Sequence, residues 1–520
     1  MYIGDYLARR ELYSPERPAI IDTGKEPEWR LTYRQLNERA NRLANWLRDE
    51  AGVGKGDRVA MLARDGVEHL DAFFACGKLG AIHTALNWRL HPHELAGIVA
   101  RTTPKALIFS DDVRARVTDL AQRVRHQSCA IGRYLHVDGE GLEGSIAFEP
   151  ALAGASAAPV TTEDLEAEDI AALIFTGGTT GLPKAAQVSH RMIAWNTLNT
   201  VIHDVTHGDI YLNVFPMFHT GGLFVYTLPQ IIFGGTTILL PRFDPQRVLE
   251  LIERERVTIF GAVPTMYQMI AQAPNWAAAD LSSLRFCTSG GAPLPVPLVE
   301  QYTREKGIRF KQGFGMTEFG PGIFALAPED AIRKAGSIGR PNFYVDARIV
   351  DDANAFLGPD QEGELVLKGP SYSSGYFGEP EAGAAAVDQR GYFHTGDIAR
   401  YDAEGYFYIV DRKKDMYISG GENVYPAEIE KALYEHPAVL MCAVIGLPDP
   451  RWGEAGRACV VLKPGAAVGE AELLAFLAGR LAKYKVPGSV VFFDELPISS
   501  AGKILKRQLR DDFLTSERRN

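Results

Sequence analysis

The stretch TGGTTGLPK at residues 176–184 directly follows the apolar run AALIF at residues 171–175. A short apolar run is typical of a buried strand, and a turn rich in Gly and Thr offers backbone N–H groups and hydroxyls that can surround phosphate oxygens. Lys184 adds a positive charge at the end of the turn. The stretch differs from the Walker motif, in which Lys directly follows the last Gly. We interpret it as a phosphate-binding loop after a strand of an α/β domain, with an ordinary surface turn as the alternative.

The composition is that of a multidomain globular enzyme. The 520 residues exceed what one hydrophobic core organises and predict two or three units, while 46% hydrophobic and 23% charged residues exclude extensive disorder. The net charge of -10 argues against a nucleic-acid partner, because a duplex-binding surface is basic. The five Cys residues form no Cys-x-x-Cys pair, so neither a disulfide framework nor a zinc site is indicated.

Two further features concern location and membranes. The N-terminal residues lack a secretory signal and the C-terminal residues lack a targeting signal, so we expect a cytoplasmic protein. Residues 210–241 contain no Asp, Glu, Lys or Arg and are long enough to span a bilayer. Pro and Gly residues interrupt this segment, and Asn213, His219 and Gln230 would need polar partners in lipid. We therefore predict buried core and no transmembrane segment, with the glycines making room for an apolar group.

The pattern along the chain predicts an α/β fold. Thr32 and Gln35 form a capping box before an apolar helical stripe that extends to about residue 49. Strand-like and helical runs then alternate, for example at residues 67–79 and 106–109, which favours open, mostly parallel sheets covered by helices. We expect two such α/β sheet subdomains in the N-terminal part.

The later parts of the chain change in character. Strands are expected at residues 257–262 and 283–287, and the Ala- and Gly-rich residues 151–158 are expected to form a loop. After residue 336, short strands punctuated by Gly predict a small antiparallel or β-barrel-like subdomain. Past Arg412, strands enclosing two helices predict a compact α+β unit.

Six further segments carry short patterns in a fixed order: GGAPL at 290–294, QGFGMTE at 312–318, YFHTGD at 392–397, DRKKD at 411–415, SGGEN at 419–423 and SAGK at 500–503. Together with residues 176–184 they resemble the signature motifs of the adenylate-forming superfamily, which includes acyl-CoA synthetases, adenylation domains of peptide synthetases and luciferases. The resemblance covers nearly the whole chain. One such motif is weak, whereas all of them in the family's order are specific.

The resemblance implies a reaction and a domain division. A carboxylate attacks the α-phosphate of ATP with Mg²⁺ present, pyrophosphate leaves, and the thiol of CoA attacks the acyl-AMP to give acyl-CoA and AMP. An N-terminal adenylation domain is implied for residues 1–412 and a small mobile α+β domain for residues 413–520, with a hinge near Lys414. Rotation about this hinge would bring Lys503 and the strand with Gly421 to the site in turn.

The same resemblance assigns the residues that hold ATP. The β- and γ-phosphates are assigned to Thr176, Gly177, Gly178, Thr179, Thr180, Gly181 and Lys184. Adenine is assigned to Gly291, Ala292, Pro293, Gly313 and Phe314, with the ring of Phe314 stacked on the base. Asp397 would bind the ribose hydroxyls with help from Arg412, although an Asp after Thr-Gly is also a common turn residue.

Three residues are assigned to the chemistry of adenylation. Glu318 would place Mg²⁺ between phosphate oxygens, and Thr317 would donate to the α-phosphate. A solvated loop carboxylate is the alternative for Glu318. Lys503 would bridge the substrate carboxylate and the α-phosphate as charge develops. Its basic neighbours Lys506, Arg507 and Arg510 make a basic helix face the alternative, but Pro497 and Gly502 before them fit a mobile loop and favour the catalytic interpretation.

Two segments are assigned to the thioester step. Gly420 and Gly421 would let a pantetheine arm pass along backbone that has no Cβ. His219 lies where the family has a gate between carboxylate and thiol, with a buried structural His as the alternative. Relatives that activate amino acids have Asp at the position of His219, so a plain carboxylic acid is the expected substrate.

The sequence departs from the common family pattern at two positions. Gly177 replaces a frequent Ser and Phe314 replaces a frequent Tyr, and both changes leave backbone donors and ring stacking in place. An apolar pocket containing Gly222, Leu223 and Phe224 would accept a fatty or aryl acid. Its depth would decide chain length, at about 0.8 kcal/mol per buried methylene.

Other functions share parts of this pattern. An acyl-AMP ligase that loads a separate carrier protein has the same adenylation residues, but no carrier domain follows Lys503, so free CoA is the expected acceptor. An inert ATP-binding relative is disfavoured because Glu318, Asp397 and Lys503 are all present. An ordinary P-loop NTPase would release ADP rather than AMP. The oligomeric state stays open.

Overall fold

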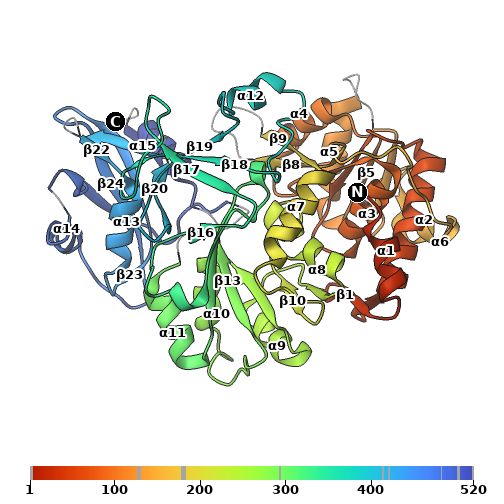
Figure 1. Cartoon of the computed structure of the whole chain (residues 1–520), viewed down its shortest axis with the longest axis horizontal. Coiled ribbons are helices and arrows are strands. Elements are labelled where there is room, and N and C mark those ends of the chain that lie inside the picture. The colour runs from red at the N-terminus through yellow and green to blue at the C-terminus, as the bar shows by residue number, and fades with distance from the viewer. Residues whose placement is uncertain are drawn as a thin grey trace.

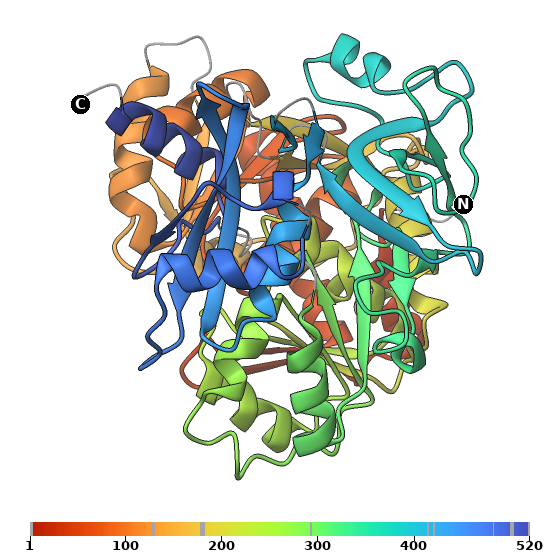
Figure 2. The same ribbon diagram turned by 90° about the vertical axis from the view of Figure 1, so that its left-hand side faces the viewer.

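The computed structural model describes residues 4–125, 131–176, 183–291, 294–412, 415–419, 422–481, 483–499 and 504–517. Figure 1 shows the early strands and helices, coloured red to orange, on one side of the molecule and the blue C-terminal unit on the other. In Figure 2 this C-terminal unit faces the viewer, in front of the large sheets. The chain therefore has a large body and a small terminal unit, as expected.

The first large sheet has seven strands in the order β7-β6-β5-β3-β4-β8-β9, all parallel except for the antiparallel pair β8–β9. Its strands are β3 (Arg58–Leu62), β4 (Ile82–Ala85), β5 (Ala106–Phe109), β6 (Arg133–His136), β7 (Ile146–Ala147), β8 (Ile170–Thr176) and β9 (Lys184–Ser189). The accompanying helices are α1 (Tyr6–Tyr13), α2 (Tyr33–Ala51), α3 (Val67–Leu79), α4 (Pro92–Thr102), η1 (Asp111–Val113), α5 (Arg114–Arg125) and α6 (Phe148–Gly154).

Local signals explain where these helices begin and end. The capping box before α2 is confirmed, because the side chain of Thr32 accepts from Gln35 N–H and the side chain of Gln35 accepts from Thr32 N–H. The loop expected at residues 151–158 is wrong in its first half. Helix α6 continues to Gly154 because Phe148 and Leu152 pack into the core of the first sheet.

The second large sheet has nine strands in the order β16-β15-β14-β13-β12-β10-β11-β1-β2, and its pairs are parallel except for the antiparallel pairs β1–β2, β14–β15 and β15–β16. Its strands are β1 (Pro18–Asp22), β2 (Trp29–Thr32), β10 (Ile210–Asn213), β11 (Thr236–Leu239), β12 (Ile259–Ala262), β13 (Phe286–Gly290), β14 (Phe310–Phe314), β15 (Phe324–Leu326) and β16 (Arg340–Pro341). Its helices are α7 (His190–Val201), η2 (Gly221–Val225), α8 (Thr227–Phe233), α9 (Pro245–Glu255), α10 (Pro264–Ala271), α11 (Val296–Lys306), η3 (Thr317–Phe319) and η4 (Pro328–Asp330).

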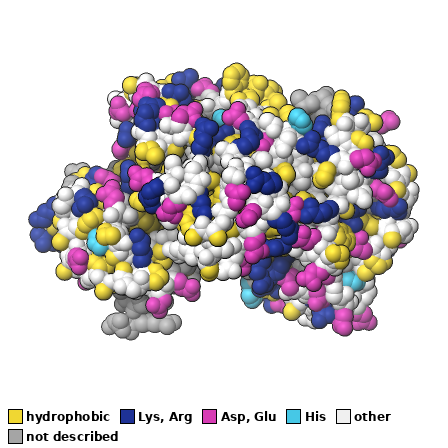
Figure 3. Space-filling model, turned by 90° about the horizontal axis from the view of Figure 1, so that it is seen from below, with side chains coloured by type: hydrophobic (Ala, Val, Ile, Leu, Met, Phe, Trp, Pro, Cys, Tyr) yellow, Lys and Arg dark blue, Asp and Glu magenta, His cyan; other side chains and the backbone are white. Residues whose placement is uncertain are grey.

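The uncharged residues 210–241 form strands β10 and β11 of this second sheet and the helices η2 and α8. The prediction that this segment is buried core is confirmed. One apolar cluster joins the two sheets and includes Phe73 of α3, Met192 of α7 and Phe224 of η2. None of the helices in the described ranges is long and apolar enough to cross a membrane. Figure 3 shows acidic and basic side chains interspersed over the face seen there.

The third sheet is antiparallel, in the order β17 (Asp346–Val350), β18 (Gly363–Lys368), β19 (Phe393–Tyr401) and β20 (Phe407–Arg412), and α12 (Pro380–Ala385) precedes β19. The antiparallel alternative is thus confirmed. The barrel-like alternative is wrong for the described strands, because β17 and β20 lie at opposite edges of an open sheet.

The C-terminal unit is α+β, as expected. Its sheet has the order β22 (Glu422–Val424), β21 (Tyr417–Ser419), β24 (Gly453–Leu462) and β23 (Val439–Asp449), with β25 (Ser489–Phe492) parallel to β24. Its helices are α13 (Pro426–Tyr434), α14 (Glu470–Ala478), η5 (Lys483–Lys485) and α15 (Lys506–Glu517). Two apolar clusters on the two sides of this sheet give the unit a core of its own.

Candidate active site

The two ends of the phosphate-loop motif lie side by side. Strand β8 ends at Thr176 and β9 begins at Lys184, and these two residues are direct partners in the antiparallel pair. Residues 177–182, which include Gly177, Gly178, Thr179, Thr180 and Gly181, lie outside the described residues. The expected strand before the loop is confirmed, and the loop connects two neighbouring strands at the carboxyl end of β8.

Tyr376, which lies outside the motifs, contacts both Glu318 and Lys184. The hydroxyl of Tyr376 donates to Glu318 Oε1 over 2.8 Å. The Nζ atom of Lys184 lies 4.8 Å from the centroid of the same tyrosine ring. Strand β9 and the short helix η3, which carries Thr317 and Glu318, are also in direct contact. The Thr-Glu motif and the phosphate loop therefore meet at one place.

The segments assigned to adenine lie at the carboxyl ends of β13 and β14. Gly290 and Gly313 are partners in this parallel pair, and Phe314 ends β14. Gly291 has a φ of 83°, a left-handed conformation that favours glycine. Ala292 and Pro293 lie outside the described residues. Gly291, Gly313 and Phe314 are thus brought to one edge of the second sheet.

The third sheet brings together the two residues assigned to the ribose. Asp397 of β19 and Arg412 of β20 are direct cross-strand partners. Asp397 is only 3% exposed, and its backbone N–H donates to Thr395 Oγ1 over 3.1 Å. Because Asp397 is buried, it is not a solvent-exposed turn residue, which was the alternative interpretation.

His219 lies in a loop that is fastened to the first sheet. Met217 N–H donates to Asp65 Oδ1 over 2.7 Å, and the rings of Phe218 and His219 lie 4.7 Å apart. Asp65 lies three residues after the end of β3. Burial raises the pKa of Asp65 to about 7, although its bond to Met217 N–H acts in the opposite direction. The loop with His219 therefore joins the carboxyl ends of both large sheets.

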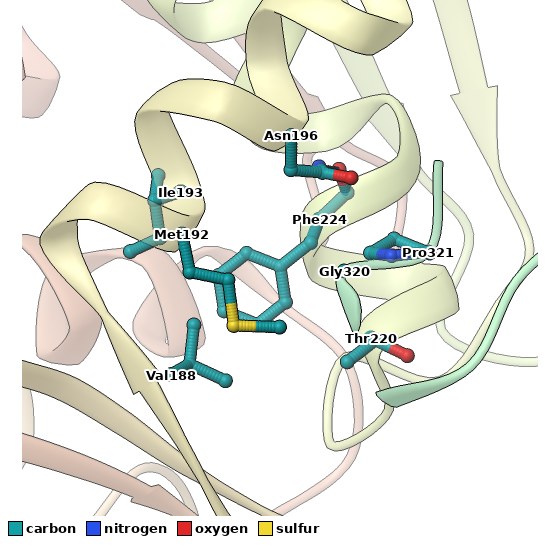
Figure 4. A pocket seen from close by; sticks show the side chains of 8 residues that line it. All are labelled: Val188, Met192, Ile193, Asn196, Thr220, Phe224, Gly320 and Pro321. Atoms are coloured by element: carbon teal, nitrogen blue, oxygen red, sulfur yellow. Dashed lines mark hydrogen bonds between the residues drawn. The ribbon is translucent and has the colours of Figure 1, made fainter. Parts of the chain in front are cut away.

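A narrow apolar cavity with almost no free volume lies between α7, η2 and the segment after η3 (Figure 4). It is lined by Val188, Met192, Ile193, Asn196, Thr220, Phe224, Gly320 and Pro321. The side chain of Asn196 joins two parts of the wall, because its Nδ2 donates to Phe224 O over 2.7 Å and its Oδ1 accepts from Gly322 N–H over 3.0 Å. Gly320 and Pro321 closely follow Glu318 in the chain, so part of the cavity wall lies next to this residue in sequence.

Of the three residues expected in the acyl pocket, Phe224 lines this cavity. Leu223 is 1% exposed and packs in the cluster between the sheets. A Cβ at Gly222 would overlap the backbone oxygen of Pro216, so this glycine permits close backbone packing. The contribution of α7 was missed, because no motif marks it. Only the spacing of Met192, Ile193 and Asn196 on one helical face could have indicated it.

Three residues assigned to the C-terminal domain lie outside the described residues: Lys414, Gly421 and Lys503. Nearby residues are described. Lys506, which begins α15, forms an ion pair with Glu430 over 2.8 Å, so it belongs to the packing of the unit. Ala427 N–H of α13 donates to Asp411 over 3.0 Å, which joins the C-terminal unit to β20.

Comparisons with known proteins agree with this geometry. The family model "AMP-binding enzyme" matches residues 7–377, and the model "AMP-binding enzyme C-terminal domain" matches residues 428–503. A feruloyl-CoA synthase from Amycolatopsis sp is 43% identical over 98% of this chain and 99% of that protein. A long-chain-fatty-acid–CoA ligase from Mycobacterium tuberculosis is 38% identical over 98% of both chains.

A solved structure supports the fold as well. ATP-bound MatB from Rhodopseudomonas palustris has a TM-score of 0.89 and 34% identity, covering 98% of this chain and 99% of that one. The similarity extends over both large sheets and the C-terminal unit, so the resemblance and the fold class inferred from the motifs are confirmed. The chain therefore belongs to the family of AMP-binding enzymes.

Proposed function

We propose that this chain is an AMP-forming acid–thiol ligase, which activates a carboxylic acid with ATP to an acyl-adenylate and transfers the acyl group to CoA. The observation that carries this proposal is the meeting of Lys184, Tyr376 and Glu318, with an apolar cavity lined in part by Gly320 and Pro321, which follow Glu318 in the chain. A bound carboxylate would there face the phosphates of ATP. The relatives named above are carboxylate–CoA ligases of nearly the same length, which supports the same reaction class.

The residues present fit ATP and Mg²⁺. Mg²⁺ is usually bound by one or two carboxylates together with phosphate oxygens, and Glu318 has one oxygen that Tyr376 does not occupy. When bound, Mg²⁺ would neutralise charge on the phosphate oxygens. Lys184 and the loop at residues 176–184 would hold the β- and γ-phosphates, and Thr317 would donate to the α-phosphate. Gly291, Ala292, Pro293, Gly313 and Phe314 would hold adenine, and Asp397 with Arg412 the ribose.

The second half of the proposal is a division of labour between two domains. Residues 1–412 would bind ATP and the acid, and residues 413–520 would rotate about Lys414. Lys503 would serve adenylation in one orientation, and the strand with Gly421 would line the path of the CoA arm in the other. His219 would separate the carboxylate from the thiol between the two steps. The hydrogen bond from Met217 N–H to Asp65 holds the loop that carries His219, which suits a residue that separates two reactants.

Replacing Gly421 by Leu is expected to slow transfer from supplied acyl-AMP to CoA by about tenfold to hundredfold, because overpacking costs roughly 1–3 kcal/mol. Pyrophosphate exchange should stay near the wild-type rate. Gly469 is a matched control, since a Cβ there meets open space in the same unit and its backbone is not left-handed. Gly469→Leu should leave both steps intact. Equal loss of both steps in Gly421→Leu would contradict the proposed path.

We further propose a compact aryl acid as the substrate. The cavity is narrow, and the ring of Phe224 forms part of its wall, with the ring of Phe73 at 6.0 Å from Phe224 in a T-shaped contact. A planar acid would fit against this aromatic wall, whereas a long alkyl chain would require Phe224 to move. The feruloyl-CoA synthase at 43% identity acts, by its name, on such an acid.

The variant Phe224→Ala should change the preferred acid. Removing the ring deepens the cavity, so kcat/KM should rise about fourfold for each methylene that a longer acid newly buries, and fall about tenfold for the aryl acid. AMP release over a panel of fatty, benzoic and cinnamic acids measures both changes. Because Phe→Ala in a core lowers the free energy of unfolding by about 3–5 kcal/mol, Phe224→Leu serves as a milder second variant. An unchanged order of substrates in both variants would show that the acid binds elsewhere.

The reaction class itself has a direct test. Incubation with ATP, Mg²⁺, an aryl acid and CoA should release AMP and pyrophosphate and form acyl-CoA. An acyl-AMP ligase that loads a carrier protein would also show carboxylate-dependent pyrophosphate exchange. Its rate of AMP release, however, would be the same with and without CoA. Release of ADP would refute the proposal. The cytoplasmic location expected from the sequence stays a prediction.

A further inference from the structure

Tyr376 occupies a place between two parts of the candidate site that the motifs treat separately. Its hydroxyl donates to Glu318 Oε1 over 2.8 Å, and its ring lies 4.8 Å from Lys184 Nζ. Lys184 and Glu318 form no ion pair with each other within the described part of the chain. The ring of Tyr376 therefore contacts the ammonium of Lys184, while its hydroxyl binds the carboxylate of Glu318.

The position of Tyr376 is fixed by backbone hydrogen bonds. Phe377 N–H donates to Ala185 O over 2.8 Å, and Gln187 N–H donates to Gly375 O over 2.9 Å, so residues 375–377 run along the edge strand β9. The same segment is joined to η3, because Ser373 N–H donates to the backbone oxygen of Glu318 over 2.8 Å. Tyr376 is thus held by the strand that begins with Lys184 and by the helix that carries Glu318.

The chemistry of a metal–triphosphate site explains why such a residue would matter. A carboxylate that pairs with a nearby ammonium offers less charge to a metal, and the ammonium offers less to a phosphate. A phenol donates one hydrogen bond and leaves the second carboxylate oxygen available. The face of an aromatic ring attracts a cation without neutralising it. Burial, followed by the charge of Glu318, raises the pKa of Tyr376, so the hydroxyl remains a donor at neutral pH.

We propose that Tyr376 is a positioning residue for adenylation, which orients the Glu318 carboxylate toward Mg²⁺ and keeps the Lys184 ammonium available for the phosphates. This inference rests on the proposed function of the site. It assigns a role to a residue outside the assigned motifs, on a segment that reaches the site only in the folded chain.

Two variants separate the hydroxyl from the ring. Tyr376→Phe should raise the free Mg²⁺ concentration needed for half-maximal pyrophosphate exchange about tenfold to hundredfold, since a hydrogen bond to a charged group is lost. Tyr376→Leu should in addition raise KM for MgATP, because Lys184 can then pair with Glu318. Transfer from supplied acyl-AMP to CoA should stay at the wild-type rate in both variants, because that step needs no triphosphate.

A binding measurement provides a readout besides activity. MgATP should raise the melting temperature of the wild type at lower Mg²⁺ concentration than that of Tyr376→Phe, with ATP plus EDTA as the metal-free reference. Tyr344→Phe is the control. It removes the hydroxyl of another half-buried tyrosine of the large body, whose ring packs at 4.8 Å from that of Trp195. This control should have the wild-type Mg²⁺ dependence.

Two results would overturn the inference. One is a wild-type Mg²⁺ dependence of both exchange and MgATP binding in Tyr376→Phe. The other is an equal loss of adenylation and acyl transfer together with a lowered melting temperature, which would make Tyr376 a residue of general packing. Failure of the proposed function has a different signature, because wild-type protein would then release no AMP with any acid, while Mg²⁺-dependent ATP binding could still be compared between variants.

Discussion

Replacing Lys503 by Ala is expected to lower the rate of adenylate formation by about 10²- to 10³-fold, while transfer from supplied acyl-AMP to CoA stays nearly unchanged. In the proposed reaction the lysine bridges the substrate carboxylate and the α-phosphate as charge develops between them. One preorganised donor of this kind typically contributes a rate factor of that size. The second step starts from a finished acyl-adenylate, so it does not need this bridge.

Carboxylate-dependent pyrophosphate exchange measures the first step, and thioester formation from supplied acyl-AMP measures the second. Lys483→Ala is a suitable control, because Lys483 is an exposed lysine of the same C-terminal unit. It should support both steps at the wild-type rate. An equal loss of both steps in Lys503→Ala would argue against two alternating orientations of the C-terminal domain.

Replacing Glu318 by Gln is expected to slow adenylation by a comparable factor of about 10²- to 10³-fold. The amide oxygen of Gln can still accept the hydrogen bond of Tyr376, so the local packing is retained. The negative charge that would hold Mg²⁺ is lost, and hard cations prefer charged oxygen ligands. Raising the Mg²⁺ concentration should therefore recover part of the rate. Pyrophosphate exchange over a range of free Mg²⁺ concentrations measures this recovery.

Glu329→Gln controls for the removal of one acidic side chain from the same region. Glu329 lies on η4, and its ion pair with Arg309 at 3.6 Å is exposed on both sides. Exposed pairs of this kind contribute about 0–1 kcal/mol, so this variant should have the wild-type Mg²⁺ dependence. A Glu318→Gln enzyme with unchanged Mg²⁺ dependence would place the metal on another ligand.

The sequence predicted helices and strands well where local signals were strong. Helix α3 and strand β5 have the expected bounds, because the apolar residues end at glycines or at a turn. Strand β13 begins three residues later than expected, at Phe286 rather than 283. Its register is set by parallel pairing with β12 and β14, and neither strand is near it in sequence. Contacts between distant segments decided this boundary.

The candidate site was predictable to a similar degree. Motif order proposed roles for Glu318, Asp397 and the loop before Lys184, because chemistry restricts which residue types can hold phosphates, a metal and a ribose; these roles stay predictions. The cross-strand pairing of Asp397 with Arg412 agrees with their joint assignment. Of the residues that line the apolar cavity, the sequence pointed only to Phe224. Packing against α7 selects its residues, and packing partners leave no short pattern in the sequence.

The phosphate-loop stretch, the composition and the ordered motifs by themselves determined the family, the α/β class and the residue types of the reaction, because these depend on local conformation and on side-chain chemistry. Only the tertiary structure decided that Tyr376 lies between Lys184 and Glu318, that Phe224 and residues of α7 line one apolar cavity, and that the third sheet is open. Each of these depends on which distant segments pack together, since burial and strand pairing join residues far apart in the chain.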